Sequence, residues 1–309
     1  MDVKDQYLNL IVNNIELKRP LKIAIDCGNG AASIIAKQVY EGLGCEVHSL
    51  FAEVDGDFPN HHPDPSKPEN LEDLKKLVEE QRLEIGLAFD GDADRLGVVS
   101  KEGKIIFPDM QMILFSNSIL KQHKEGKIVF DVKCSKLLSD AILTEGGTPI
   151  MAKTGHSYIK KCIREEKALL GGEMSGHIFF NDRWPGFDDG IYAGARMLEI
   201  ISNLNENEDV FKGLPKLVST PEINIESTDD EKFKVVEDFI SRANYKDSKS
   251  ILIDGIRIEF DFGWGLLRAS NTSPILVLRF EADTQENLES IKNTFRRTLN
   301  DVNPNLGSF

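Results

Sequence analysis

The chain has 309 residues, which is too long for one ordinary domain and predicts two or three separate cores. Hydrophobic residues make up 40% and charged residues 28% of the sequence, the balance of a globular protein that can bury its apolar surface. The formal net charge of -14 argues against nucleic acid or an anionic membrane as a partner, because such a surface repels both, so local basic groups must hold any anionic substrate.

Hydrophobic periodicity predicts alternating helices and strands over the first hundred residues. A proline-rich loop over 58–68 interrupts them, and the last strand runs directly into an acidic cluster that begins at Asp90. The βαβ order predicts a parallel or mixed sheet. In chain order we expect a helix near 3–11, a strand over 21–25, a helix over 31–40, a strand over 46–51, a helix over 70–81 and a strand over 84–89.

A second α/β unit is predicted from about Pro108, and a loop-like stretch with two prolines follows over 214–221. The second unit should hold a helix over 108–120, a strand over 127–132, a helix that ends near 143 and a strand over 149–152. Strands and two helices in α+β order are expected after the loop. The predicted fold class is therefore α/β, with two mixed α/β sheet domains over 1–106 and 107–219 and a smaller α+β C-terminal domain over 220–309.

The four cysteines are widely spaced and include no Cys-x-x-Cys pair, which fits neither a zinc site nor a dense disulfide framework. The first twenty residues have mixed charges and no apolar core of the signal-peptide type. No later run approaches the length of a membrane span. We therefore expect a protein of the reducing cytoplasm.

Three aspartates, Asp90, Asp92 and Asp94, alternate with small residues directly after the predicted strand 84–89. Ligands of open α/β sheets bind at the carboxyl ends of the strands, so this position favours a functional site. A bend there would bring three carboxylates onto one hard cation such as Mg²⁺, which would offset their like charge. The alternative is a solvated acidic turn.

Glu173, Ser175 and His177 occupy alternate positions in the segment Gly-Gly-Glu-Met-Ser-Gly-His, so an extended backbone would aim all three at one surface. Such a set can bind sugar hydroxyls. A carboxylate and an imidazole can also exchange protons near neutral pH. The alternative is a glycine-rich turn with an ordinary surface histidine.

The segment Arg268 to Pro274, Arg-Ala-Ser-Asn-Thr-Ser-Pro, precedes an apolar strand and resembles a phosphate-binding loop. A guanidinium binds phosphate oxygens in a bidentate manner, and hydroxyls and loop amides add donors without adding charge. A simple turn rich in Ser and Asn would explain the small residues but not Arg268.

Two weaker patterns are Lys133 after a predicted strand and Lys-Thr-Gly-His-Ser over 153–157, either of which can be only a strand end. The run Gly28-x-Gly30-x-x-Ser33 approaches the dinucleotide-binding fingerprint. It lacks the third glycine and a clear acidic partner, so a dinucleotide site is the poorer explanation.

Taken in order, these motifs resemble the α-D-phosphohexomutase family, especially its bacterial phosphomannomutase/phosphoglucomutase branch. The resemblance covers nearly the whole chain. The matching segments are 26–30, 58–65, 90–95, 153–157, 172–177, 186–190 and 268–274.

The resemblance implies a role for each loop. It implies Mg²⁺ binding by Asp90, Asp92 and Asp94, sugar recognition by Glu173, Ser175 and His177, and phosphate binding by Arg268, Ser270, Asn271 and Thr272. Lys133 and His156 match family positions that contact the ligand, and Arg95 is expected near a phosphorylated serine. His177 and Glu173 are the candidates for proton exchange with the sugar hydroxyl.

Family members begin with a further α/β domain whose Thr-Ala-Ser-His-Asn-Pro type loop carries the catalytic serine, and this sequence has no Ser-His-Asn segment. That serine would hold the transferable phosphoryl group and supply a ligand to the metal. The resemblance implies interconversion of mannose or glucose 1- and 6-phosphates through a bisphosphate, with this chain inactive alone. A separate N-terminal phosphoserine domain is then a candidate partner, as in a split mutase. The alternative is a phosphosugar-binding protein without catalysis.

Overall fold

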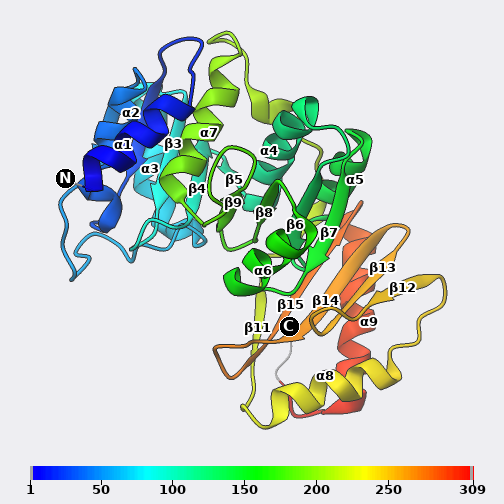
Figure 1. The fold of residues 1–309 in the computed structure, drawn as a ribbon. Helices are drawn as coiled ribbons and strands as arrows, with labels where there is room; N and C mark the ends of the chain where they lie inside the picture. Colours follow the sequence, from blue (N-terminus) through cyan, green and yellow to red (C-terminus); the bar gives the residue numbers. More distant parts are fainter. Residues whose placement is uncertain (1–2, 307–308) are drawn as a thin grey trace. The chain divides into compact units, whose positions relative to one another are not determined.

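The computed structural model describes residues 3–306 and 309 of the chain (Figure 1). The residues form two compact units. The first extends to Ile150 and continues over Gly155–Leu214, and the second joins Met151–Thr154 to the chain from Pro215 onward. Each unit is described by itself below.

A mixed five-stranded sheet lies in the first unit, in the order β2-β1-β3-β4-β5. Strand β1 pairs in parallel with β2 and with the central strand β3, and β4 pairs antiparallel with both β3 and β5. All five residues of β3 and of β4 are buried, so these strands form the centre of the core. The strands are β1 Lys22–Asp26, β2 Glu46–Leu50, β3 Ile85–Phe89, β4 Leu96–Ser100 and β5 Ile105–Ile106.

Helices contact this sheet through apolar residues spaced three or four positions apart, which lie on one face of a helix. Helix α3, Glu72–Gln81, contacts β1, β3 and β4, and Leu74 and Val78 of α3 belong to one buried cluster with Ala24 and Val99 of the strands. Helix α2, Ala36–Gly42, contacts β2 and α1, Val3–Asn14, while α7, Gly190–Ser202, contacts β3 and β4.

A second sheet of the same unit has the order β7-β6-β8-β9, with β6 and β8 parallel and β8 and β9 antiparallel. Two glycines of β8 allow helices to lie close: a Cβ on Gly171 would meet Ile163 of α6, and one on Gly172 would meet Met112 of α4. Helix α7 also contacts β9 and α4, so it is shared by the two sheets (Figure 1). The elements are α4 Pro108–Gln122, β6 Lys127–Asp131, α5 Lys136–Thr144, β7 Thr148–Ala152, α6 His156–Glu166, β8 Leu170–Gly172 and β9 Ile178–Phe180.

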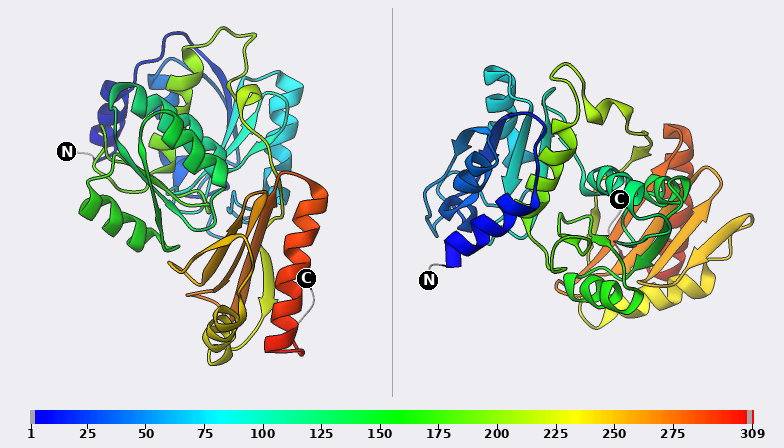
Figure 2. Two further views of the ribbon diagram at one scale, coloured as in Figure 1. Left: turned by 90° about the vertical axis from the view of Figure 1, so that its right-hand side faces the viewer. Right: turned by 45° about the horizontal axis from the view of Figure 1, so that its top comes forward.

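The second unit is an antiparallel sheet of order β10-β15-β14-β13-β12, in which β11 also pairs with β15. Helices α8 and α9 contact it, and Figure 2 shows α9 lying along the strands. Phe239, Phe280 and Phe295 are fully buried where helices and sheet meet. The elements are β10 Val218–Ser219, β11 Ile223–Glu226, α8 Glu231–Arg242, β12 Ser248–Ile251, β13 Ile256–Phe260, β14 Gly263–Ala269, β15 Ile275–Ala282 and α9 Gln285–Val302.

The predicted fold class is confirmed: two mixed α/β sheets precede a smaller α+β part. One predicted helix is wrong in detail, because 31–40 is a 3₁₀ turn, Ala31–Ile34, followed by α2. Ile35 separates them with φ -146° and ψ -21°, outside the helical region. Within residues 3–306 and 309, no helix is both long and apolar enough to span a membrane.

Candidate functional site

The three aspartates lie in the loop between β3 and β4, after the carboxyl end of a strand that runs parallel to β1. One oxygen from each of Asp90, Asp92 and Asp94 lies within 4.8 Å of the others. Asp90 is buried, Asp94 is half-buried and Asp92 is exposed, so the carboxylates converge on a point that is open on one side. Burial and the neighbouring carboxylates raise the pKa of Asp94, against the opposing effect of His177.

Arg95 fixes the shape of this loop. Its backbone N–H donates to Asp90 Oδ1 at 3.0 Å, and its Nε donates to Asp90 Oδ2 at 2.6 Å. Nη1 donates to Asp64 Oδ1 at 3.0 Å, which links the loop to the proline-rich segment. The arginine thus offsets the charge of the most buried aspartate and holds its carboxylate in one orientation.

The turn after β1 packs directly against the backbone of the aspartate loop. Ala31 N–H donates to Gly91 O at 2.9 Å, and a Cβ on Gly30 would lie 2.6 Å from that same oxygen. The glycine near-match to a dinucleotide fingerprint therefore serves close backbone packing against the loop.

Glu173, Ser175 and His177 lie in a tight turn between β8 and β9. The expectation of an extended backbone is wrong: Glu173 N–H donates to His177 O at 2.9 Å, and Gly176 N–H donates to Glu173 O at 3.0 Å. Gly176 has φ +101°, which a side chain rarely permits. Ser175 is half-buried at the tip of the turn.

Glu173 is buried, and its Oε1 accepts from Gly155 N–H at 2.6 Å, at the first turn of α6. Burial, followed by the charge of Asp131, raises the pKa of Glu173 to about 7. A carboxyl group with this pKa can both donate and accept a proton near neutrality.

Lys133 follows β6 and is buried, with Nζ 3.9 Å from Asp131 Oδ2. Asp131 is fully buried and also accepts from the backbone N–H of Lys133 at 3.0 Å and of Met174 at 3.4 Å. Asp131 therefore ties the strand that carries Lys133 to the turn that carries Glu173.

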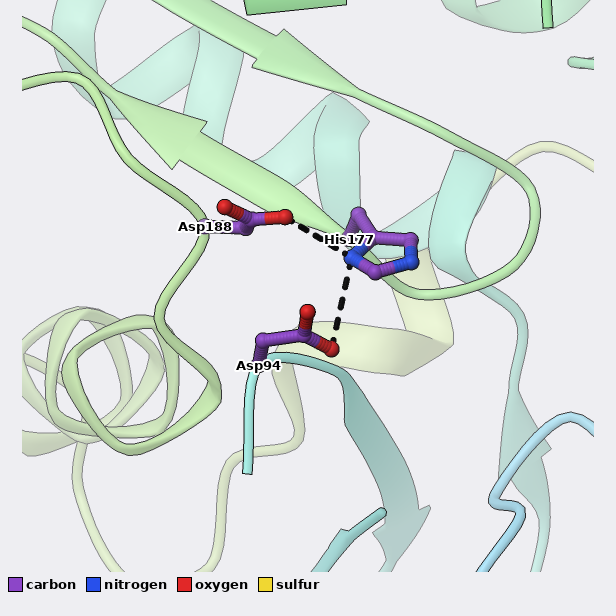
Figure 3. A group of neighbouring side chains, drawn as sticks. All are labelled: Asp94, His177 and Asp188. Carbon is purple, nitrogen blue, oxygen red and sulfur yellow. Dashed lines mark ion pairs between the residues drawn. The ribbon is translucent and has the colours of Figure 1, made fainter. Parts of the chain in front are cut away.

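The aspartate loop and this turn meet directly. Arg95 and His177 form an isolated antiparallel bridge, and Leu96 N–H donates to Gly176 O at 3.1 Å. Figure 3 shows Asp94 and Asp188 pointing at the same imidazole nitrogen of His177, with Nδ1 3.4 Å from Asp94 Oδ1 and 3.1 Å from Asp188 Oδ2. Burial opposes the charged imidazole, but Asp188 and Asp94 raise the pKa of His177 above its usual value.

Asp188 is a residue that sequence reasoning missed, although the segment 186–190 was noted. Besides His177, its carboxylate pairs with Lys160 Nζ at 3.1 Å and lies 3.8 Å from His156 Nδ1. The His156 ring is stacked on His177, with centroids 5.7 Å apart, and more than half of its side chain is exposed. The sequence signal that could have identified Asp188 is its position in a pair of consecutive aspartates directly before a helix. The second of the pair, Asp189, caps α7 by accepting from Tyr192 N–H at 2.9 Å and from the Tyr7 hydroxyl at 2.9 Å.

The predicted phosphate loop belongs to the second unit. Arg268 is buried at the end of β14, and its Nε donates to Asp254 Oδ2 at 2.8 Å. Ser270 Oγ accepts from the backbone N–H groups of Thr272 and Ser273 at 3.3 and 3.2 Å, while Asn271 and Thr272 are exposed. Asp254 Oδ2 also accepts from Thr154 N–H at 3.1 Å. Asp254 therefore contacts both Arg268 and Thr154, a connection that the sequence analysis did not predict.

The predicted residues therefore fall into two sets. Within the first unit the structure brings together Asp90, Asp92, Asp94, Arg95, Glu173 and His177, with Lys133 and His156 beside them. Within the second unit it brings together Arg268, Ser270, Asn271 and Thr272 on one strand end and its loop.

Three family models match the chain in succession. Phosphoglucomutase/phosphomannomutase domain II matches residues 5–103, domain III matches 107–218, and the C-terminal domain matches 222–298. The chain belongs to the α-D-phosphohexomutase family. In this family context, the two matched α/β/α domains correspond to the two sheets of the first unit, and the last match lies in the second unit.

Several relatives of the phosphohexomutase family are similar along the whole chain. A phosphomannomutase/phosphoglucomutase of Pseudomonas syringae pv. tomato and a phosphoglucomutase of Neisseria meningitidis serogroup A are each 53% identical over 99% of this chain. A crystal structure of a family protein from Burkholderia thailandensis has a TM-score of 0.94 and 46% identity over 99% of this chain. The chain spans about two thirds of the length of these relatives, 66% in each case.

Proposed function

We propose that the chain supplies the metal-binding, sugar-binding and phosphate-binding parts of a phosphohexomutase. This enzyme is an isomerase that interconverts hexose 1-phosphate and hexose 6-phosphate through a phosphoserine and a bisphosphate intermediate. The observation that carries the proposal is the bridge between Arg95 and His177, because it joins the aspartate loop and the proposed sugar turn in one site. The similarity to mutases of known name along 99% of the chain supports the same function.

Asp90, Asp92 and Asp94 fit Mg²⁺. Their donors are hard carboxylate oxygens that converge within 4.8 Å, and the buried Asp94 Oδ1 has no hydrogen-bond partner among the described residues. When bound, Mg²⁺ would offset negative charge on the phosphoryl group in transfer. Arg95 holds Asp90 in place and adds a positive charge beside the reacting phosphate.

The sugar would lie against the turn between β8 and β9. Glu173, Ser175 and His177 would bind its hydroxyls, with Lys133 and His156 at the edge of the same surface. His177 or Glu173 would exchange a proton with the reacting hydroxyl, since burial raises the pKa of Glu173 to about 7 and Asp188 and Asp94 raise the pKa of His177 above its usual value.

The phosphate that is not reacting would bind to Arg268, Ser270, Asn271 and Thr272. Arg268 donates from Nε to Asp254, which holds the planar guanidinium in a fixed orientation for a bidentate contact through its other nitrogens. We also propose a division into domains over 1–106, 107–219 and 220–309, each with one of the three loops.

The phosphoryl donor would be a serine that this sequence does not contain in the family's Ser-His-Asn context. The purified chain should therefore show no interconversion of mannose or glucose 1- and 6-phosphates in the presence of Mg²⁺ and a hexose bisphosphate. Robust turnover by the chain alone would contradict this part of the proposal.

Joining the N-terminal domain of a relative ahead of the chain should create turnover, since a covalent link removes the entropy cost of association. Turnover of the fusion should fall when Arg268 is replaced by Ala, because the substrate is then poorly positioned. A folded fusion that binds hexose phosphate without turnover would instead favour a non-catalytic phosphosugar-binding protein.

A further inference from the structure

The proline-rich loop over 58–68 lies against the turn that follows β1, and polar side chains hold the two together. His61 Nε2 lies 3.0 Å from Asp26 Oδ2, and Asn60 Nδ2 donates to Asn29 Oδ1 at 2.8 Å. All four residues belong to the first unit. The chemistry proposed above uses none of their side chains, so these contacts need an explanation of their own.

Asp26 is a buried carboxylate at the end of β1, and its side chain is only 1% exposed. Both of its oxygens accept hydrogen bonds, Oδ1 from Gly28 N–H at 2.9 Å and Oδ2 from the ring of His61. Hydrogen bonds that are accepted on both oxygens favour the ionised form. A buried carboxylate of this kind is costly unless a positive group lies beside it.

His61 faces an acceptor on each side of its ring. Nε2 faces the Asp26 carboxylate, and Nδ1 lies 3.0 Å from the backbone oxygen of His62. Neither oxygen can donate, so both ring nitrogens must carry a proton. Turning the ring over would place carbon atoms opposite both oxygens and lose both hydrogen bonds. These contacts therefore require a charged imidazolium.

The electrostatic surroundings of His61 favour the same charge. The hydrogen bond to Asp26 has the largest effect, and it raises the pKa of His61 to about 8 although partial burial opposes the charge. The charged groups that act on the ring are Asp26 and, from α3, Asp73, and both are negative.

The same loop reaches Arg95 through Asp64. Asp64 Oδ1 accepts from Arg95 Nη1 at 3.0 Å, and Arg95 in turn donates to Asp90. The backbone N–H of Asp64 donates to the His62 oxygen at 2.8 Å, which is the oxygen that the His61 ring faces. One carbonyl group thus connects the imidazolium to the residue that contacts Arg95.

We propose that His61 is a positioning residue for Arg95: its imidazolium fixes the proline-rich loop on the end of β1, and Asp64 of that loop then holds Arg95 against Asp90. The inference deepens the proposed function and rests on it, because Arg95 and Asp90 belong to the proposed metal site. A neutral imidazole has only one N–H. It can bond to one of the two oxygens but turns a lone pair toward the other, so the loop is held less firmly once His61 loses its proton.

The first test is the titration of His61 in the full chain by nuclear magnetic resonance. His61 should titrate near pH 8, and Asp26→Asn should return it toward the ordinary value of 6.5. The His61→Gln spectrum identifies the signal. Titration of the wild-type residue at or below pH 6.5 overturns the proposal, and this result does not depend on how well any variant folds.

The second test is calorimetric titration of Mg²⁺ into the wild-type chain, His61→Gln and His62→Gln between about pH 6.5 and about pH 9.5. Near neutral pH, His61→Gln should weaken Mg²⁺ binding by roughly three- to tenfold, less than the loss of a direct partner of a metal ligand causes. The difference should shrink as the pH rises past 8, because the wild-type ring then loses its proton too.

The comparison between chains isolates His61. Ionisation of the aspartates affects all three chains alike, so it cancels in the ratio of their affinities. His62→Gln changes the adjacent, exposed histidine of the same loop and should match the wild type. A purely structural role of His61 would give a ratio that does not change with pH, and that outcome overturns the proposal.

A third readout separates this proposal from the metal assignment. The Nε–H of Arg95 donates to Asp90 at 2.6 Å, so its resonance reports the position of Arg95 without any metal. The resonance should shift in His61→Gln and stay in place in His62→Gln. If the wild-type chain binds no Mg²⁺ but the resonance shifts, the metal assignment fails and the positioning role stands. If Mg²⁺ binds and the resonance is unchanged in His61→Gln, the positioning role is wrong.

Discussion

His177 lies opposite Arg95 in an antiparallel bridge, so the turn that carries Glu173 is joined backbone to backbone with the loop that carries the three aspartates. A third segment joins them, since Gly190 N–H donates to Ala93 O at 3.0 Å. The site of the first unit is thus held mainly by main-chain contacts. Changes that separate these backbones should disturb every function of the site at once.

Gly190→Ala should therefore destabilise the chain and weaken Mg²⁺ binding. A Cβ at this position would lie 2.6 Å from Arg95 O, and a backbone atom cannot move away without moving the aspartate loop. We expect a loss of about 1–3 kcal/mol in the free energy of unfolding, measured with urea. Gly213→Ala is the matched control, because its Cβ would meet no atom within 4 Å. Equal stability of the two variants would contradict this account of the loop.

Asp92→Asn should lower the affinity for Mg²⁺ by at least roughly tenfold in calorimetry, because a neutral amide replaces one of three charged ligands. Asp92 is exposed, so the fold should not change. Asp57→Asn, an exposed aspartate in another loop, should leave the affinity unaltered. An unchanged affinity in Asp92→Asn would refute the assignment of this loop.

Stability should depend on pH through Glu173. Burial raises its pKa in the folded chain to about 7 from 4.5, so the folded state binds a proton more strongly than the unfolded state. The group's contribution is full below pH 4.5 and is lost as the pH rises to about 7, by up to about 3 kcal/mol. Glu173→Gln keeps an acceptor for Gly155 N–H and should remove this slope from urea unfolding. A slope identical to wild type would show that Glu173 does not titrate in this range.

Arg268→Ala should weaken binding of hexose 6-phosphate by roughly ten- to a hundredfold, the effect of losing charge-assisted hydrogen bonds worth about 1.5–3 kcal/mol. Arg268→Lys keeps the charge but not the planar fork, so it should restore only part of the affinity. Arg297→Ala removes an exposed arginine of α9 and serves as the control. Wild-type affinity in Arg268→Ala would place the phosphate elsewhere.

Tyr7→Phe should destabilise the first unit by about 1.5–3 kcal/mol, the worth of a hydrogen bond to a charged group. Its hydroxyl donates to both oxygens of Asp189, the buried cap of α7. Tyr158→Phe removes an exposed hydroxyl and should be neutral. Thermal unfolding of both variants measures the difference, and equal midpoints would mean that water replaces the Tyr7 hydroxyl at no cost.

The sequence predicted the fold and the three loops because each signal was local. Alternating apolar residues followed by Asp90, Asp92 and Asp94 specify a strand and the loop after it, and the structure has both. Gly176 was also a local signal for a turn, and giving it more weight would have corrected the expectation of an extended backbone.

The contacts of Asp188 could not be predicted in this way. Asp188 is separated from His177 in the sequence by β9 and an irregular loop, and Asp94 lies between two strands of a different sheet. The same holds for Asp254, which pairs with Arg268 from the strand hairpin before it. No periodicity connects such residues, since their proximity depends on how the elements pack.

Helix α7 lies between the two sheets of the first unit, and residues 190–198 are all buried. A methyl group on Gly194 would lie 2.4 Å from the hydroxyl of Tyr40, which in turn donates to Ile191 O at 2.9 Å. Over evolutionary time, Gly194 is then not free to vary alone: Gly194→Ala becomes tolerable only after a change such as Tyr40→Phe has removed the hydroxyl. Among relatives, a larger residue at the position of Gly194 should therefore occur together with a smaller or hydroxyl-free residue at the position of Tyr40, and the change at Tyr40 should come first.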